Sequence, residues 1–195
     1  LYPDPSQFHN PFLLNDMNRA VDRILKAIQQ REIIYIFGDY DCDGITSSTI
    51  LKQALEKLGA HVISCLPLRE DGYGLTPLAV DALPQNVSLL ITVDNGSSAH
   101  PAMKRAKEKG IDVIVTDHHE VLGEHPSCLA FVNPKRKDNT YPYPHLCGAG
   151  VALKLIQALF MTLKQDWIKE TWNYIEYATI GTIADVMPLT GESRA

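Results

Sequence analysis

Three carboxylates stand on alternate positions of one short, glycine-flanked segment. Asp39, Asp41 and Asp43 lie in GDYDCDG (38–44), directly after an apolar run. Carboxylates this close repel one another unless a cation lies between them. The spacing fits the first half of a calcium-binding EF-hand loop, but the twelfth position of such a loop would be Ile50 instead of Glu, which excludes that loop. A different kind of metal site is therefore expected.

Further acids and imidazoles follow other apolar segments. Asp94 comes after SLLITV, Asp185 stands in GTIADVMPL, and the run IDVIVT is followed by Asp117, His118 and His119. Taken singly, an aspartate after a strand is often a helix N-cap, and a histidine pair is often an accident of a loop. If the fold brings these acids together, their mutual repulsion would destabilise it unless cations neutralised the charge. Oxygen and imidazole ligands suit Mg²⁺ or Mn²⁺, and two such ions can promote hydrolysis of a phosphate ester.

The elements that must position these groups alternate along the chain. The predicted strands are 33–37, 61–67, 88–94, 111–117 and 128–134, and the predicted helices are 15–30, 46–58, 99–109, 148–163 and 167–184. The strands are continuous apolar runs, which is typical of a parallel sheet buried on both faces. We therefore predict an α/β fold with a parallel sheet flanked by helices on both faces. Ligands bind at the carboxyl ends of such strands, where the acids and histidines stand.

Composition sets wider limits on the function. No apolar run approaches the roughly 18 residues of a membrane span, so we expect a soluble chain without a membrane partner. Scattered cysteines indicate reduced thiols and a cytoplasmic location; they are Cys42, Cys65, Cys128 and Cys147. The net charge of −5 argues against nucleic-acid binding by electrostatics alone, although bound divalent cations would offset much of it. The missing initial Met and abrupt end predict a fragment, with a helical leader at 1–30 and a catalytic domain at 31–195.

Four segments carry a family resemblance. DYDCDG, VDNG, TDHHE and GTIADVMPL, in this order, resemble the four motifs of the DHH phosphoesterase family. Within it, LREDGYGLT and HLCGAGVALKL are most similar to the bacterial exonucleases specific for single-stranded DNA. The resemblance implies a monomeric enzyme of DNA repair and recombination. It would use two Mn²⁺ or Mg²⁺ ions to degrade single-stranded DNA from the 5′ end to mononucleotides, with a single-strand-binding protein or a RecQ-type helicase as partner.

Two alternatives stay open at this point. Other DHH hydrolases act on short oligonucleotides, cyclic dinucleotides or pyrophosphate. Some replication proteins share the fold as non-catalytic scaffolds, although those tend to lose metal ligands, and every acid of the family motifs is present in this sequence.

The resemblance also implies roles for the metal-binding residues. Asp41 and Asp43 would lean towards different ions, and Asp94 would bridge the two. Many family members carry a histidine ligand just before the paired aspartates, where this sequence has Phe37, Gly38 and Asp39. Asp39 or a water would therefore complete the ligands of the first ion. The predicted metal ligands are Asp39, Asp41, Asp43, Asp94, His118 and Asp185.

Phosphate contacts are predicted from the same resemblance and from glycine-rich segments. His119 matches the second histidine of the third motif, which in the family contacts the scissile phosphate. Gly148 and Gly150 open a helix, so their N–H groups could hold a phosphate, or they could serve close packing instead. DGYGLT, with Tyr73 and the nearby Arg69, could be a substrate loop or an ordinary surface turn.

Overall fold

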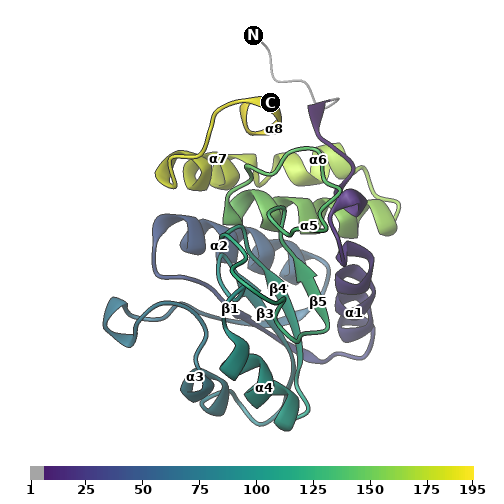
Figure 1. Cartoon of the computed structure of the whole chain (residues 1–195). Coiled ribbons are helices and arrows are strands. Elements are labelled where there is room, and N and C mark those ends of the chain that lie inside the picture. Colours follow the sequence, from purple (N-terminus) through teal and green to yellow (C-terminus); the bar gives the residue numbers. More distant parts are fainter. Residues whose placement is uncertain (1–6) are drawn as a thin grey trace.

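Strands and helices alternate along the chain, as the sequence predicts. The computed structural model describes residues 7–195, so the first six residues of the predicted leader lie outside it. Within that range, five strands pair in parallel in the order β2-β1-β3-β4-β5 (Figure 1). They are β1 (Ile33–Phe37), β2 (His61–Cys65), β3 (Val87–Val93), β4 (Asp112–Thr116) and β5 (Ala130–Val132). The predicted α/β fold with a parallel sheet is confirmed.

Helices cover both faces of this sheet. Their bounds are α1 (Met17–Gln29), α2 (Cys42–Lys57), α3 (Pro77–Asp81), α4 (His100–Glu108), α5 (Gly148–Thr162), α6 (Trp167–Trp172), α7 (Ile175–Ala184) and α8 (Gly191–Arg194). Short 3-10 turns lie at Pro11–Leu13 and Arg69–Asp71. Helices α1, α2 and α5 pack on one face and α3 and α4 on the other, while α6, α7 and α8 lie beyond α5 (Figure 1).

The buried side chains of the strands divide between the two faces. Ile36 and Ile91 belong to the cluster packed against α1, α2 and α5. Leu90 and Val115, on the alternate positions, belong to the cluster packed against α3 and α4. Because successive strand residues point to opposite faces, a sheet covered on both sides needs apolar residues at every position. This is why the strands appear as unbroken apolar runs.

Helix α2 begins four residues earlier than the sequence pattern predicts. Its first residue is Cys42, and the Oδ1 of Asp41 caps it by accepting a hydrogen bond from the N–H of Gly44 at 2.9 Å. The loop between β1 and α2 therefore ends at Asp41, and Asp43 lies in the first turn of the helix. Gly44 lies inside the helix, where a Cβ would stand 2.5 Å from the carbonyl oxygen of Asp39. The glycine thus allows α2 to start close to the end of β1.

The helix predicted at 167–184 is two helices. Asn173 follows α6 and turns its side-chain amide back to the carbonyl oxygens of Lys169 and Glu170. Side-chain hydrogen bonds of this kind compete with the helical pattern, and α7 starts anew at Ile175. None of the helices described within residues 7–195 has the length and apolar character that crossing a bilayer requires.

Candidate metal centre at the carboxyl edge of the sheet

All six predicted metal ligands converge at one edge of the sheet. Asp39 follows β1, Asp94 follows β3, His118 follows β4, and Asp185 ends α7. Their ligand atoms fall into overlapping groups in which every atom lies within 4.8 Å of the others: Asp39, Asp41 and Asp94; Asp43, His118 and Asp185; and Asp94, His118 and His119. We call the six predicted ligands the cage. Asp94 and His118 occur in two groups each, so they lie at its centre.

The Asp43 carboxylate is fixed by the N-terminus of α5. Its Oδ2 accepts a hydrogen bond from the N–H of Gly148 at 2.6 Å, and its Oδ1 accepts one from Ala149 at 2.9 Å. A helix N-terminus favours negative charge, so it stabilises this buried carboxylate. The N–H of Gly150 donates to Cys147 Sγ at 3.3 Å. The phosphate contact predicted for the two glycines therefore lacks free N–H donors, and the structure favours the packing alternative.

Close packing is visible directly at Gly148. A Cβ on this residue would lie 2.6 Å from the Cβ of Asp94, so only glycine fits against the central carboxylate. Gly181 of α7 packs equally closely against Asp43, because a Cβ on this residue would stand 2.5 Å from Asp43 Oδ1. These two glycines let α5 and α7 approach the cage.

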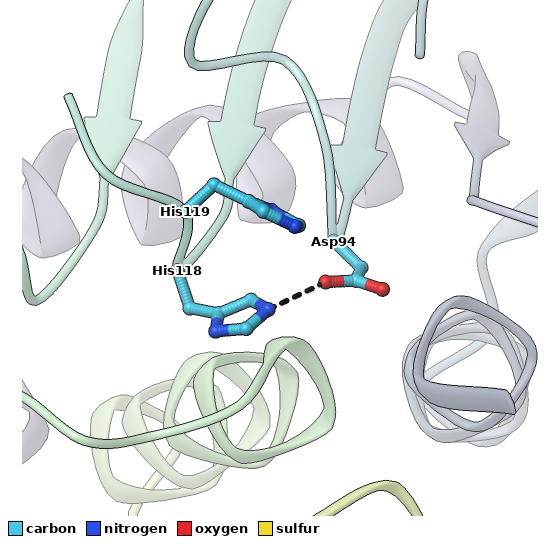
Figure 2. A group of neighbouring side chains, drawn as sticks. All are labelled: Asp94, His118 and His119. Atoms are coloured by element: carbon cyan, nitrogen blue, oxygen red, sulfur yellow. Dashed lines mark ion pairs between the residues drawn. The ribbon is translucent and has the colours of Figure 1, made fainter. Parts of the chain in front are cut away.

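The centre of the cage carries an electrostatic conflict. Asp94 is 1% exposed, and burial together with the nearby charge of Asp43 raises its pKa to about 11. Its Oδ1 lies 3.0 Å from Nε2 of His118, and Figure 2 shows the two side chains facing each other from the ends of neighbouring strands. Burial, and then the charge of His119, lower the pKa of His118, which favours the neutral imidazole that ligates metals.

Orphaned polar atoms test whether this site fits a metal. Among the residues that the structure describes, Oδ1 of Asp94 and both ring nitrogens of His118 are buried without a hydrogen-bond partner of acceptable geometry. Buried polar atoms are normally paired, and leaving them unpaired is costly. A divalent cation would satisfy the facing pair and relieve the repulsion among the acids. The carboxylate-rich donor set with one imidazole fits Mg²⁺ or Mn²⁺.

Comparison with known proteins identifies the family. A sequence profile described as the DHH family, N-terminal domain, matches residues 33–183. The chain belongs to the DHH family.

Relatives of this chain include exonucleases specific for single-stranded DNA. The single-stranded-DNA-specific exonuclease RecJ of Bacillus subtilis is 43% identical over 196 residues, which covers 100% of this chain and 24% of that protein. A crystal structure of exonuclease RecJ bound to manganese superposes with a TM-score of 0.84 at 36% identity, covering 93% of this chain and 46% of the other. RecJ of Thermus thermophilus in complex with Mg²⁺ gives a TM-score of 0.65 at 31% identity, covering 93% and 22%. The chain thus spans about a quarter of the length of the Bacillus relative.

Asp117, the first residue of the DHH motif, has a role that the sequence did not reveal. Its Oδ1 lies 2.8 Å from Nδ1 of His119, and its Oδ2 accepts a hydrogen bond from the N–H of Ser97 at 2.9 Å. Burial alone would raise the pKa of Asp117, but the hydrogen bonds and charge of His119 hold it at about 2. The same contact raises the pKa of His119. Aspartates often accept hydrogen bonds from nearby backbone N–H groups in turns, so the sequence alone does not indicate that Asp117 also contacts His119.

Two further predicted groups are exposed to solvent. Arg69 is exposed, with its guanidinium 5.4 Å from the ring centroid of Tyr40, which sits between Asp39 and Asp41. The side chain of His119 is 45% exposed and reaches the cage at Asp94 and His118. An anionic ligand could reach both groups from solvent.

Proposed function

We propose that this chain is the catalytic domain of a metal-dependent phosphodiesterase that degrades single-stranded DNA from the 5′ end to mononucleotides. The observation that supports this most is the facing pair Asp94 and His118 at the centre of the six-ligand cage. Among the described residues, Oδ1 of Asp94 and both ring nitrogens of His118 are buried without a hydrogen-bond partner. The substrate is inferred from the relatives named as exonucleases specific for single-stranded DNA.

The ligand groups support two ion positions that share Asp94. One set comprises Asp39, Asp41 and Asp94, and the other comprises Asp43, His118 and Asp185. Asp94 would be shared through His118, with which it forms a further group. When bound, two Mn²⁺ or Mg²⁺ ions would lower the pKa of a water and neutralise charge on the phosphate. The helix N-terminus at Gly148 holds Asp43 in place before any ion arrives. This part of the cage is therefore preorganised.

His119 is the chain's own group for the scissile phosphate. Asp117 fixes Nδ1 of its ring and favours the protonated form, so the imidazole can donate a hydrogen bond to a phosphate oxygen as charge develops there. Arg69, exposed beside Tyr40, would attract a neighbouring phosphate. Monomeric state, partner proteins, cytoplasmic location and the domain boundary near residue 30 stay predictions.

A nuclease assay on the natural protein that contains this sequence tests the proposed function. Single-stranded DNA labelled at either end, matched duplex, dinucleotides, cyclic dinucleotides and pyrophosphate are incubated with Mn²⁺ or with EDTA. We expect metal-dependent release of mononucleotides from the 5′ end of the single strand, strongly reduced in His119→Ala. Cleavage of the short substrates without cleavage of the long strand would overturn the proposal in favour of another DHH hydrolase.

A further inference from the structure

Tyr73 reaches the cage from an unexpected direction. It lies in the connection between β2 and α3, whereas its hydroxyl contacts His119, which follows β4. The sheet order places β1 and β3 between those two strands. Three strand spacings of about 4.8 Å separate β2 from β4, so the connection and the Tyr73 side chain together span about 14 Å along the carboxyl edge of the sheet. The Tyr73 hydroxyl therefore reaches the cage from the far side of the sheet.

The contact of Tyr73 with His119 involves both its hydroxyl and its ring. The hydroxyl oxygen lies 3.1 Å from Nδ1 and 3.3 Å from Nε2 of His119, and 3.5 Å from the carbonyl oxygen of Asp94. The two rings meet edge to face, with centroids 5.6 Å apart. Because the hydroxyl oxygen is almost equally far from both ring nitrogens and the rings meet edge to face, it lies over the face of the imidazole. Asp117 engages Nδ1 at 2.8 Å, so Nε2 is the nitrogen left for a phosphate oxygen. The imidazole is thus held at Nδ1 by Asp117 and against its face by the hydroxyl of Tyr73.

The surrounding backbone displays Tyr73 at the surface. Gly72 and Gly74 have φ values of 88° and 75°, a region that glycine enters without strain. Leu75 is buried in the core and anchors the connection to the sheet, while Tyr73 remains 54% exposed. A surface turn alone would not require the side chain of Tyr73 to contact His119, so we expect this contact to have a role in the site.

We propose that Tyr73 is a positioning residue that holds the imidazole of His119 in the orientation in which it meets the scissile phosphate. The inference rests on the proposed function, in which His119 contacts that phosphate. Asp117 alone fixes one nitrogen and leaves the ring free to tilt about that hydrogen bond. The second contact from Tyr73 removes this freedom. The loop from β2 therefore assembles the phosphate-binding end of the site from across the sheet.

Tyr73→Phe tests the contact without relying on activity, because it keeps the ring and removes only the hydroxyl. In the metal-free 195-residue chain, the ring ¹⁵N signals of His119 are compared by NMR at one fixed pH. Tyr177→Phe, on α7 and packed against the core, is the matched control. We expect the His119 signals to shift in Tyr73→Phe and to stay unchanged in Tyr177→Phe. Unchanged signals in Tyr73→Phe would overturn the inference.

Kinetics on single-stranded DNA, in the natural protein that contains this sequence, give the second readout. Misorienting one group of a site lowers the rate of the chemical step, so we expect kcat of Tyr73→Phe to fall about 10-fold with KM within twofold of wild type. A raised KM with an unchanged kcat would show that Tyr73 binds substrate and would overturn the positioning role. If the wild-type protein cleaves no DNA, the proposed function fails, and the NMR comparison alone decides whether Tyr73 holds His119.

Discussion

Replacing Asp94 by Asn isolates the electrostatic conflict at the centre of the cage. Asp94 has a φ of 62°, a conformation that Asn and Asp tolerate better than other residues with a Cβ, so Asn keeps the backbone and the shape of the side chain. It removes the ionisable group, so residue 94 cannot become charged at any pH. We expect Asp94→Asn to stabilise the metal-free protein and, at the same time, to abolish the stabilisation that Mn²⁺ gives to the wild type.

The size and sign of the effect follow from the pKa of Asp94. In the metal-free fold this pKa is raised from 3.8 to about 11, by burial first and by Asp43 second. At pH 7 Asp94 is therefore protonated in the folded protein, whereas in the unfolded chain it has already lost its proton about three pH units below, near its ordinary pKa of 3.8. At roughly 1.4 kcal/mol per unit, the free energy of unfolding is reduced by at most about 4 kcal/mol. Because the folded state binds more protons between pH 4 and pH 11, its stability falls as the pH rises through that window.

Guanidinium unfolding at pH 6, 7 and 8, in EDTA and in Mn²⁺, measures both effects. In EDTA the wild type should lose stability as the pH rises, whereas Asp94→Asn should be more stable at pH 8 and show a flatter dependence. Asp81→Asn, which changes a surface aspartate of α3 paired with Arg105, is the control and should behave as wild type apart from a small offset. The reasoning is refuted if Asp94→Asn is less stable than wild type in EDTA, or if Mn²⁺ stabilises it as much as the wild type.

Gly181→Ala tests the packing around the cage, and Glu192→Gln tests the contact between α8 and α5; each has a second variant for comparison. Gly181→Ala would place a Cβ 2.5 Å from Asp43 Oδ1, so unfolding measurements should show a loss of about 1–3 kcal/mol and calorimetry a weaker response to Mn²⁺. Gly150→Ala, whose Cβ would lie 3.3 Å from its nearest neighbour, should perturb both much less, and equal effects would contradict the argument. Glu192→Gln leaves the ammonium of Lys154, 2% exposed and 2.8 Å from Glu192 Oε1, without its charged partner. Denaturant unfolding should show a loss of about 3 kcal/mol, partly restored by adding Lys154→Met; a loss below about 1 kcal/mol would mean that the pair is not needed.

The ligand set could be predicted from sequence because its signals are local. Asp39, Asp94 and His118 each stand within two residues of the end of an apolar run, and parallel strands bring their carboxyl ends to one edge, so these three had to lie near one another. Asp185 was noted as an acid after an apolar helix, and only the resemblance of its motif gave it a place in the ligand set, since a residue at the end of α7 carries no strand signal.

The supporting contacts could not be predicted because they join distant parts of the chain. Asp43 is held by the N–H of Gly148, 105 residues away, and no spacing pattern encodes that pairing. The glycine of that pair suggested a phosphate site, whereas the structure gives its N–H to a carboxylate. Tyr73 and His119 likewise meet only because the connection after β2 crosses the sheet edge, which depends on the strand order.

The most direct test of the two-ion cage is a crystal structure with Mn²⁺, in which anomalous scattering locates each ion. The account predicts two anomalous peaks per chain on either side of Asp94. One should lie among Asp39, Asp41 and Asp94, and the other among Asp43, His118 and Asp185. A single peak that does not touch Asp94, or Mn²⁺ bound only outside these residues, would contradict it.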